Sequence, residues 1–74
     1  MKMDRDKFKA ETWDKRNTLG VIRYDGTVVA GWSRDEVTDQ VHVACGNGSK
    51  EWRGIGLGVV IKQAISDMCE GRMD

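Results

Sequence analysis

Two runs of β-forming residues, 18–24 and 27–33, are joined by Asp25-Gly26 in the first half of the chain. Asp-Gly between two such runs favours a type I′ turn, because both central positions of that turn need a positive φ. The pattern therefore predicts a β-hairpin. Residues 40–45 predict a third strand, since polar and apolar side chains alternate there. Its two faces would be formed by Val41, Val43 and Cys45 on one side and Gln40, His42 and Ala44 on the other.

The last quarter of the chain has a helical pattern from residue 58 to about residue 70. Apolar side chains recur there every three or four positions, which is typical of an amphipathic helix. Gly71 is a natural end for this helix, because glycine can adopt the left-handed conformation past the last turn. The apolar face consists of Leu57, Ile61, Ala64, Ile65 and Met68.

The N-terminal residues 2–16 are mostly charged, and Phe8 and Trp13 are their only large apolar side chains. They predict a short, weak helix from about Asp4 to Trp13, or a solvated segment that docks through these two side chains. We therefore expect one small α+β domain over residues 1–74. It would comprise a helical lead-in (1–17), a three-stranded antiparallel sheet (18–45), a glycine-rich loop (46–58) and one amphipathic helix packed on the sheet (58–71).

Charge and composition narrow the classes of function. Twelve Lys and Arg balance twelve Asp and Glu, so no net charge draws the protein to nucleic acid or membranes. The N-terminus lacks the apolar core of a signal peptide, and no apolar run reaches the ~18 residues of a membrane span. We therefore expect a cytoplasmic protein. One histidine (His42) and two cysteines without CxxC spacing (Cys45 and Cys69) predict neither a metal site nor a disulfide framework.

The sequence EWRGIGLGVV, residues 51–60, places three glycines between bulky apolar residues just before the predicted helix. Such a position favours a bound phosphate, because the N–H groups of residues 57–61 would begin the helix without internal partners. A Walker A loop is excluded because Gly58 is followed by Val59-Val60 rather than by Lys and Ser or Thr. A dinucleotide-binding fingerprint is excluded because only 16 residues follow Gly58, too few for a second strand.

Arg53, Gly56 and Gly58 fit the pattern R-x-x-G-x-G. With the hairpin, the third strand and the helix around it, this segment resembles the acetyl-CoA signature of the GCN5-related N-acetyltransferase (GNAT) superfamily, over about residues 19–70. The resemblance implies that backbone amides of the loop bind the coenzyme pyrophosphate and that the strand at 40–45 lies along the pantetheine arm. The implied cofactor is acetyl-CoA or CoA. The implied binding residues are Arg53, Gly54, Gly56, Leu57, Gly58 and Val59.

The chain departs from the GNAT pattern in ways that leave catalysis open. A family domain is about twice as long, and its fifth strand, which opens the coenzyme cleft, has no counterpart here. The only tyrosine, Tyr24, lies at the hairpin turn and does not match the family's proton donor. No catalytic residue is assigned. A base would have to be Glu36, Asp39 or His42, and a partly exposed structural histidine is the simpler interpretation of His42. Cys45 would pack as a small apolar group.

The predicted third strand would leave one sheet edge unpaired, so we expect a homo-oligomer or a protein partner at that edge. Two functions remain open. The first is an acetyltransferase-like module that binds acetyl-CoA and catalyses N-acetyl transfer only as an oligomer. The second is a non-enzymatic binding or structural protein, such as a small viral accessory protein, that uses half the fold as a scaffold. A nucleic-acid module is disfavoured by the zero net charge, although it could use Arg34, Lys50, Arg53 and Lys62.

Overall fold

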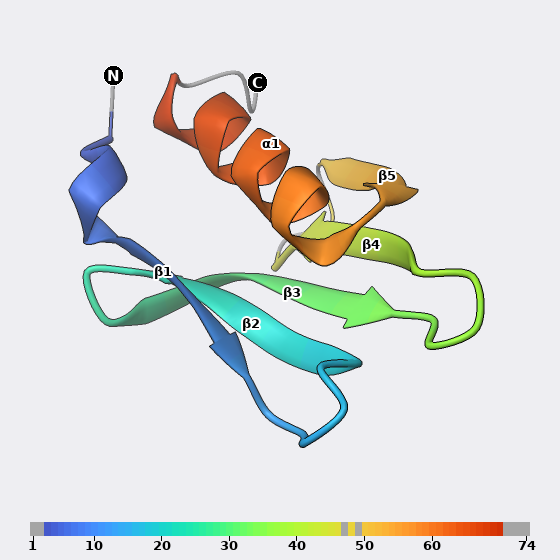
Figure 1. Ribbon diagram of the computed structural model, residues 1–74. Coiled ribbons are helices and arrows are strands. Elements are labelled where there is room, and N and C mark those ends of the chain that lie inside the picture. Colours follow the sequence, from blue (N-terminus) through green and yellow to red (C-terminus); the bar gives the residue numbers. More distant parts are fainter. Residues whose placement is uncertain (1–2, 47, 49, 71–74) are drawn as a thin grey trace.

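The chain folds as a five-stranded antiparallel sheet with one helix across one of its faces (Figure 1). The computed structural model describes residues 3–46, 48 and 50–70. Each strand pairs with the next along the chain, giving the order β1-β2-β3-β4-β5. The elements are the 3₁₀ turn η1 (Arg5–Lys7), β1 (Phe8–Thr12), β2 (Leu19–Tyr24), β3 (Thr27–Arg34), β4 (Gln40–Cys45), β5 (Glu51–Ile55) and the helix α1 (Leu57–Cys69).

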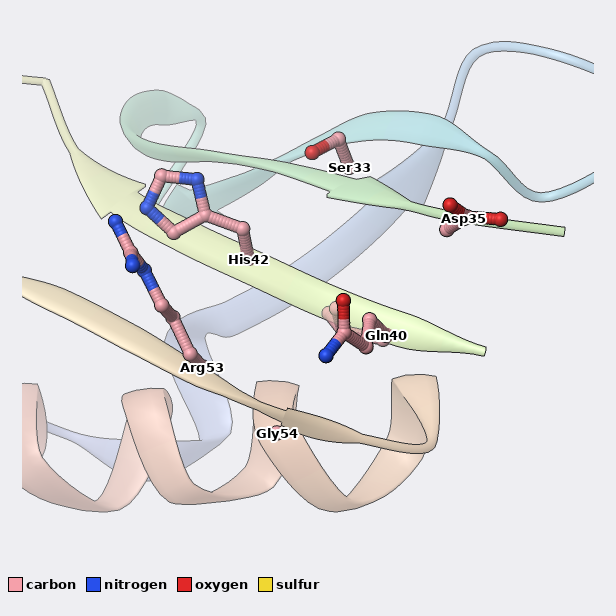
Figure 2. Close-up of a pocket in the computed structure, with 7 residues that line it drawn as sticks. Ser33, Asp35, Gln40, His42, Arg53 and Gly54 are labelled. Carbon is pink, nitrogen blue, oxygen red and sulfur yellow. The ribbon is translucent and has the colours of Figure 1, made fainter. Parts of the chain in front are cut away.

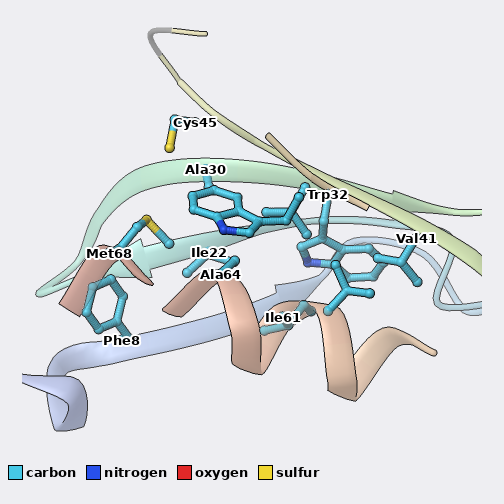
Figure 3. Packing of buried hydrophobic residues seen from close by; sticks show 12 residues of the cluster. Phe8, Ile22, Ala30, Trp32, Val41, Cys45, Ile61, Ala64 and Met68 are labelled. Carbon is cyan, nitrogen blue, oxygen red and sulfur yellow. The ribbon is translucent and has the colours of Figure 1, made fainter. Parts of the chain in front are cut away.

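The core lies between α1 and the sheet (Figure 3). Alternate residues of each strand point toward the helix, and cross-strand pairs such as Trp32 with Val43 therefore lie on the same side of the sheet. Burial of this face is the main stabilising contribution, at roughly 25 cal/mol per Å² of apolar surface. The buried cluster contains Phe8, Ile22, Ala30, Trp32, Val41, Val43, Cys45, Trp52, Val60, Ile61, Ala64 and Met68.

The predicted α+β class and the predicted hairpin are confirmed. Asp25 and Gly26 have φ values of 51° and 88°, as a type I′ turn requires, and β2 and β3 pair on either side of them. The helix is also confirmed, and it begins at Leu57, one residue before the predicted start. The predicted end at Gly71 lies outside the described residues.

The predicted N-terminal helix from Asp4 to Trp13 is wrong. Only Arg5–Lys7 is helical, and Phe8–Thr12 is a strand that pairs with β2. Phe8 is buried and its ring lies 4.7 Å from that of Tyr24, with Tyr24 directly opposite in the sheet. The strand forms because β2 offers an unpaired edge and Phe8 an apolar contact. Tertiary pairing of this kind outweighs the helical propensity of a charged segment.

The predicted glycine loop over residues 46–58 is wrong over Glu51–Ile55, which form the strand β5. Trp52 is buried beneath α1, and its indole Nε1 donates to Asp67 Oδ2 at 2.8 Å. Gly54 allows α1 to pack closely, since a Cβ at this position would lie 3.0 Å from Val60 Cγ2. The sheet therefore has five strands and not the predicted three. The edge predicted to be exposed, at the third strand (β4), is covered by β5.

Candidate functional site

The face of the sheet that points away from α1, called the outer face, carries no covering element among the described residues (Figure 1). One row of it is formed by Leu19, Ser33, His42 and Arg53, which are successive cross-strand partners from β2 to β5. Trp13 extends this row, because its N–H donates to the Leu19 carbonyl at 2.8 Å and so continues the β1–β2 pairing. Gly31 and Ala44 are cross-strand partners beside this row, and neither has a side chain that projects far from the sheet.

The row has an apolar end. Trp13 and Leu19 are 58% and 49% exposed, respectively, although both are large and apolar. The turn between β1 and β2 holds them in place: the Asp14 carboxylate accepts hydrogen bonds from the Thr18 hydroxyl and the N–H groups of Thr18 and Leu19. These bonds hold the pKa of the Asp14 carboxyl below its ordinary value, with the Thr18 hydroxyl as the largest cause.

The other end of the row is charged. His42 Nε2 lies 2.5 Å from Glu51 Oε1, and Arg53 donates to the same oxygen at 3.3 Å. The hydrogen bond with His42, followed by that from Arg53, lowers the pKa of the Glu51 carboxyl. The side chains of all three are between 43% and 75% exposed, so water screens these interactions. The cluster thus presents both signs of charge to solvent.

A shallow open depression of about 360 Å³ lies beside this cluster (Figure 2). The side chains of His42 and Arg53 project from the sheet on the side opposite α1, and Ser33 lies next to His42 across the β3–β4 pair (Figure 2). The lining of the depression is polar and carries both signs of charge, so the depression favours neither an anion nor an apolar ligand. The lining residues are Ser33, Asp35, Gln40, Val41, His42, Arg53 and Gly54.

The residues implied by the R-x-x-G-x-G pattern are divided between two places. Arg53 and Gly54 belong to β5, and Arg53 points to the outer face (Figure 2). Gly56 precedes the helix with φ at 94°, and Leu57, Gly58 and Val59 form the first turn of α1. The Gly56 N–H is engaged with the Asp39 carbonyl at 3.0 Å. What remains of the predicted pyrophosphate site is the first turn, which has no side-chain cap.

The strand expected to lie along a pantetheine arm is occupied on both sides. β4 pairs with β3 through Val41–Cys45 and with β5 through Gln40–Ala44. Backbone groups that a bound pantetheine would use are hydrogen-bonded within the sheet instead. The sequence pattern could not reveal this, because β5 is formed from the same residues as the glycine motif.

The candidate bases and the candidate nucleophile have structural surroundings. Glu36 pairs with Arg16 at 3.5 Å, and Asp39 pairs with Arg34 at 3.0 Å. Burial raises the pKa of the Cys45 thiol, which disfavours the reactive thiolate. Among the described residues, no hydrogen bond joins Ser33 to His42 and no cluster could hold a metal ion.

Sequence reasoning missed Ser33 and Asp35 in the depression and did not foresee that Trp13 would stand next to Leu19. The alternation Glu51-Trp52-Arg53 was the signal for a strand with a polar outer side, but the glycines that follow concealed it. No helix in the described ranges is long and apolar enough to cross a membrane. Comparison of the chain with protein-family models, with curated proteins and with solved structures finds no match.

Proposed function

We propose that this chain is a non-enzymatic protein-binding module whose binding surface is the outer face. The observation that carries the proposal is the exposed pair Trp13 and Leu19, which shares a cross-strand row with a charged cluster on a face that no other described element covers. Exposed apolar groups rimmed by polar ones are typical of protein interaction sites. Trp and Arg are also the residues most enriched among those that dominate binding energy at interfaces.

The row from Trp13 to Arg53 suits a partner of matching chemistry. Its apolar end would bury against an apolar side chain of the partner, and desolvation there would supply affinity. Its charged end would set orientation, because Glu51 and Arg53 present opposite signs close together. The sheet provides a rigid base, since each residue of the row is anchored in a strand or in the hydrogen-bonded turn that precedes β2.

Site-specific photo-crosslinking in the cells of origin tests this surface. A photoreactive residue at Leu19 is expected to yield one dominant protein adduct, which the same residue at Lys62 on the exposed side of α1 does not yield. Adding Trp13→Ala should reduce that adduct about thirtyfold, because truncating an aromatic residue that dominates an interface costs about 2 kcal/mol or more. Identical adducts from the two positions, with circular dichroism showing a folded chain, would refute the outer face as the binding surface.

Acetyl-CoA binding is a second candidate, favoured by the uncapped first turn of α1. Gly58 is the informative position, because a Cβ there meets nothing within 4 Å, whereas Gly56 has a positive φ that strains any side chain. In this candidate, Gly58→Glu abolishes the heat of acetyl-CoA titration by placing a carboxylate against the phosphate, while an acidic side chain near a helix N-terminus leaves the fold stable. No heat from the parent chain would dismiss the coenzyme and leave the protein-binding proposal standing.

A further inference from the structure

The free edge of β5 has a defined set of unpaired backbone groups. Two hydrogen bonds show which residues of β5 have their backbone groups bonded to β4. The Cys45 N–H donates to the Lys50 carbonyl, and the Gly56 N–H donates to the Asp39 carbonyl, both at 3.0 Å. Since such pairs alternate along an antiparallel ladder, Trp52 and Gly54 direct their backbone groups toward β4. The backbone groups of Glu51, Arg53 and Ile55 therefore point away from the sheet.

β5 is short and carries the charged residues Glu51 and Arg53, but two other features that protect edge strands, a proline and a bulge, are missing from it. The chain contains no proline, and the register of β5 with β4 has no break. The opposite edge, at β1, is better protected, because η1 precedes it and the Phe8 N–H already donates to the Arg5 carbonyl. The edge of β5 is thus the more available of the two for strand addition.

The charges on this edge are self-complementary. Glu51 and Arg53 have their side chains on the same face, two residues apart. If two copies of β5 pair antiparallel with Glu51 opposite Arg53 of the second copy, each edge carboxylate meets a guanidinium. A register shifted by one step of two residues places Arg53 opposite Arg53 of the second copy, which is repulsive. Opposite charges therefore select one register.

We propose that the chain forms a symmetric dimer through its β5 edges, with Glu51 of each copy paired to Arg53 of the other. The sheets then join into one continuous antiparallel sheet with Trp52 at the two-fold axis. His42 keeps its contact with Glu51 and orients that carboxylate. Trp13 and Leu19 lie at the β1–β2 side of each sheet and stay free for the outer-face partner proposed above, whereas the charged end of that face is shared with the dimer.

Charge exchange tests the pairing. By sedimentation velocity, the parent chain should dimerise, and Glu51→Arg should weaken the dimer about tenfold or more, because attraction becomes repulsion at both symmetric positions. The double variant Glu51→Arg/Arg53→Glu should restore it. A parent chain that stays monomeric at millimolar concentration, or a dimer that Glu51→Arg leaves unchanged, would overturn the proposal.

A backbone variant and a crosslink test the edge and the register. Arg53→Pro removes the guanidinium and, from the backbone, only an N–H that points away from the sheet, so it should abolish the dimer more completely than Arg53→Ala, which removes the guanidinium alone, while circular dichroism stays that of the parent. Mixed Glu51→Cys and Arg53→Cys chains should oxidise to a heterodimer, because hydrogen-bonded partners lie about 5.5 Å apart between Cα atoms. A dimer that survives Arg53→Pro, or that crosslinks through Arg53→Cys alone, would contradict this edge or this register.

Discussion

Replacing Gly20 with alanine is expected to destabilise the fold by about 3 kcal/mol or more, the upper range for overpacking a core. A Cβ at Gly20 would lie 2.5 Å from Cζ2 of the Trp32 indole and closer still to the Glu11 carbonyl oxygen. The indole of Trp32 lies against the glycine opposite it on β2, and β1 approaches from the other side. Neither neighbour can yield easily, because one belongs to a strand backbone and the other is buried. Urea unfolding followed by tryptophan fluorescence measures the change.

Gly31→Ala is the matched control, since Gly31 lies in the adjacent strand and has no positive φ. The nearest atom to its Cβ would be the Gly20 carbonyl oxygen at 3.9 Å, an ordinary contact. We expect a change in the free energy of unfolding within about 0.5 kcal/mol, with a small gain from reduced freedom of the unfolded chain. Equal destabilisation by the two substitutions would show that the Trp32 indole does not lie against Gly20.

Trp52→Ala is expected to cost about 3–5 kcal/mol, the usual range for truncating a buried tryptophan. Trp52 is 7% exposed, and the substitution also removes the donor of its hydrogen bond to Asp67. A chain of 74 residues has roughly 4–11 kcal/mol of stability in total, at about 0.05–0.15 kcal/mol per residue. A large fraction of the molecules should therefore be unfolded, which circular dichroism at increasing temperature would register as a much lower midpoint.

The neighbouring substitution Arg53→Ala serves as its control. The Arg53 side chain is 75% exposed and pairs only with the exposed Glu51 carboxylate in the described structure. Surface pairs of this kind contribute about 0–1 kcal/mol, so the midpoint should change little. If residues 51–55 formed a loop, Trp52→Ala and Arg53→Ala would have similar small effects, and that outcome would contradict the assignment of β5 as a strand.

The parts of the fold that follow from local sequence were predictable. Asp25-Gly26 determines the hairpin by itself, because few other dipeptides fit two positive φ values, and the spacing from Leu57 to Met68 determines the helix. The two edge strands, β1 and β5, were missed for a common reason. β1 has only Phe8 as a large buried residue and β5 has only Trp52, so neither shows the repeated alternation that marks a strand.

The candidate site was less predictable than the fold. Gly56 indicated backbone freedom correctly, since its positive φ allows the turn into α1, whereas Gly54 serves close packing against Val60. The outer face is assembled from side chains far apart in the sequence, from Trp13 to Arg53, and depends on the register of all five strands. A register cannot be predicted where strands themselves are missed, since a shift of one residue exchanges the two faces.

The most direct test is amide hydrogen exchange and nuclear Overhauser effects on the labelled chain, because the outer face, the closed β4 backbone and the dimer edge all depend on β5. We predict an Hα–Hα contact between His42 and Arg53, and slow exchange of the Trp52 and Gly54 amides, which face β4. Fast exchange at both amides, with no cross-strand contact to β4, would contradict this account and return residues 51–58 to a glycine loop with free backbone donors.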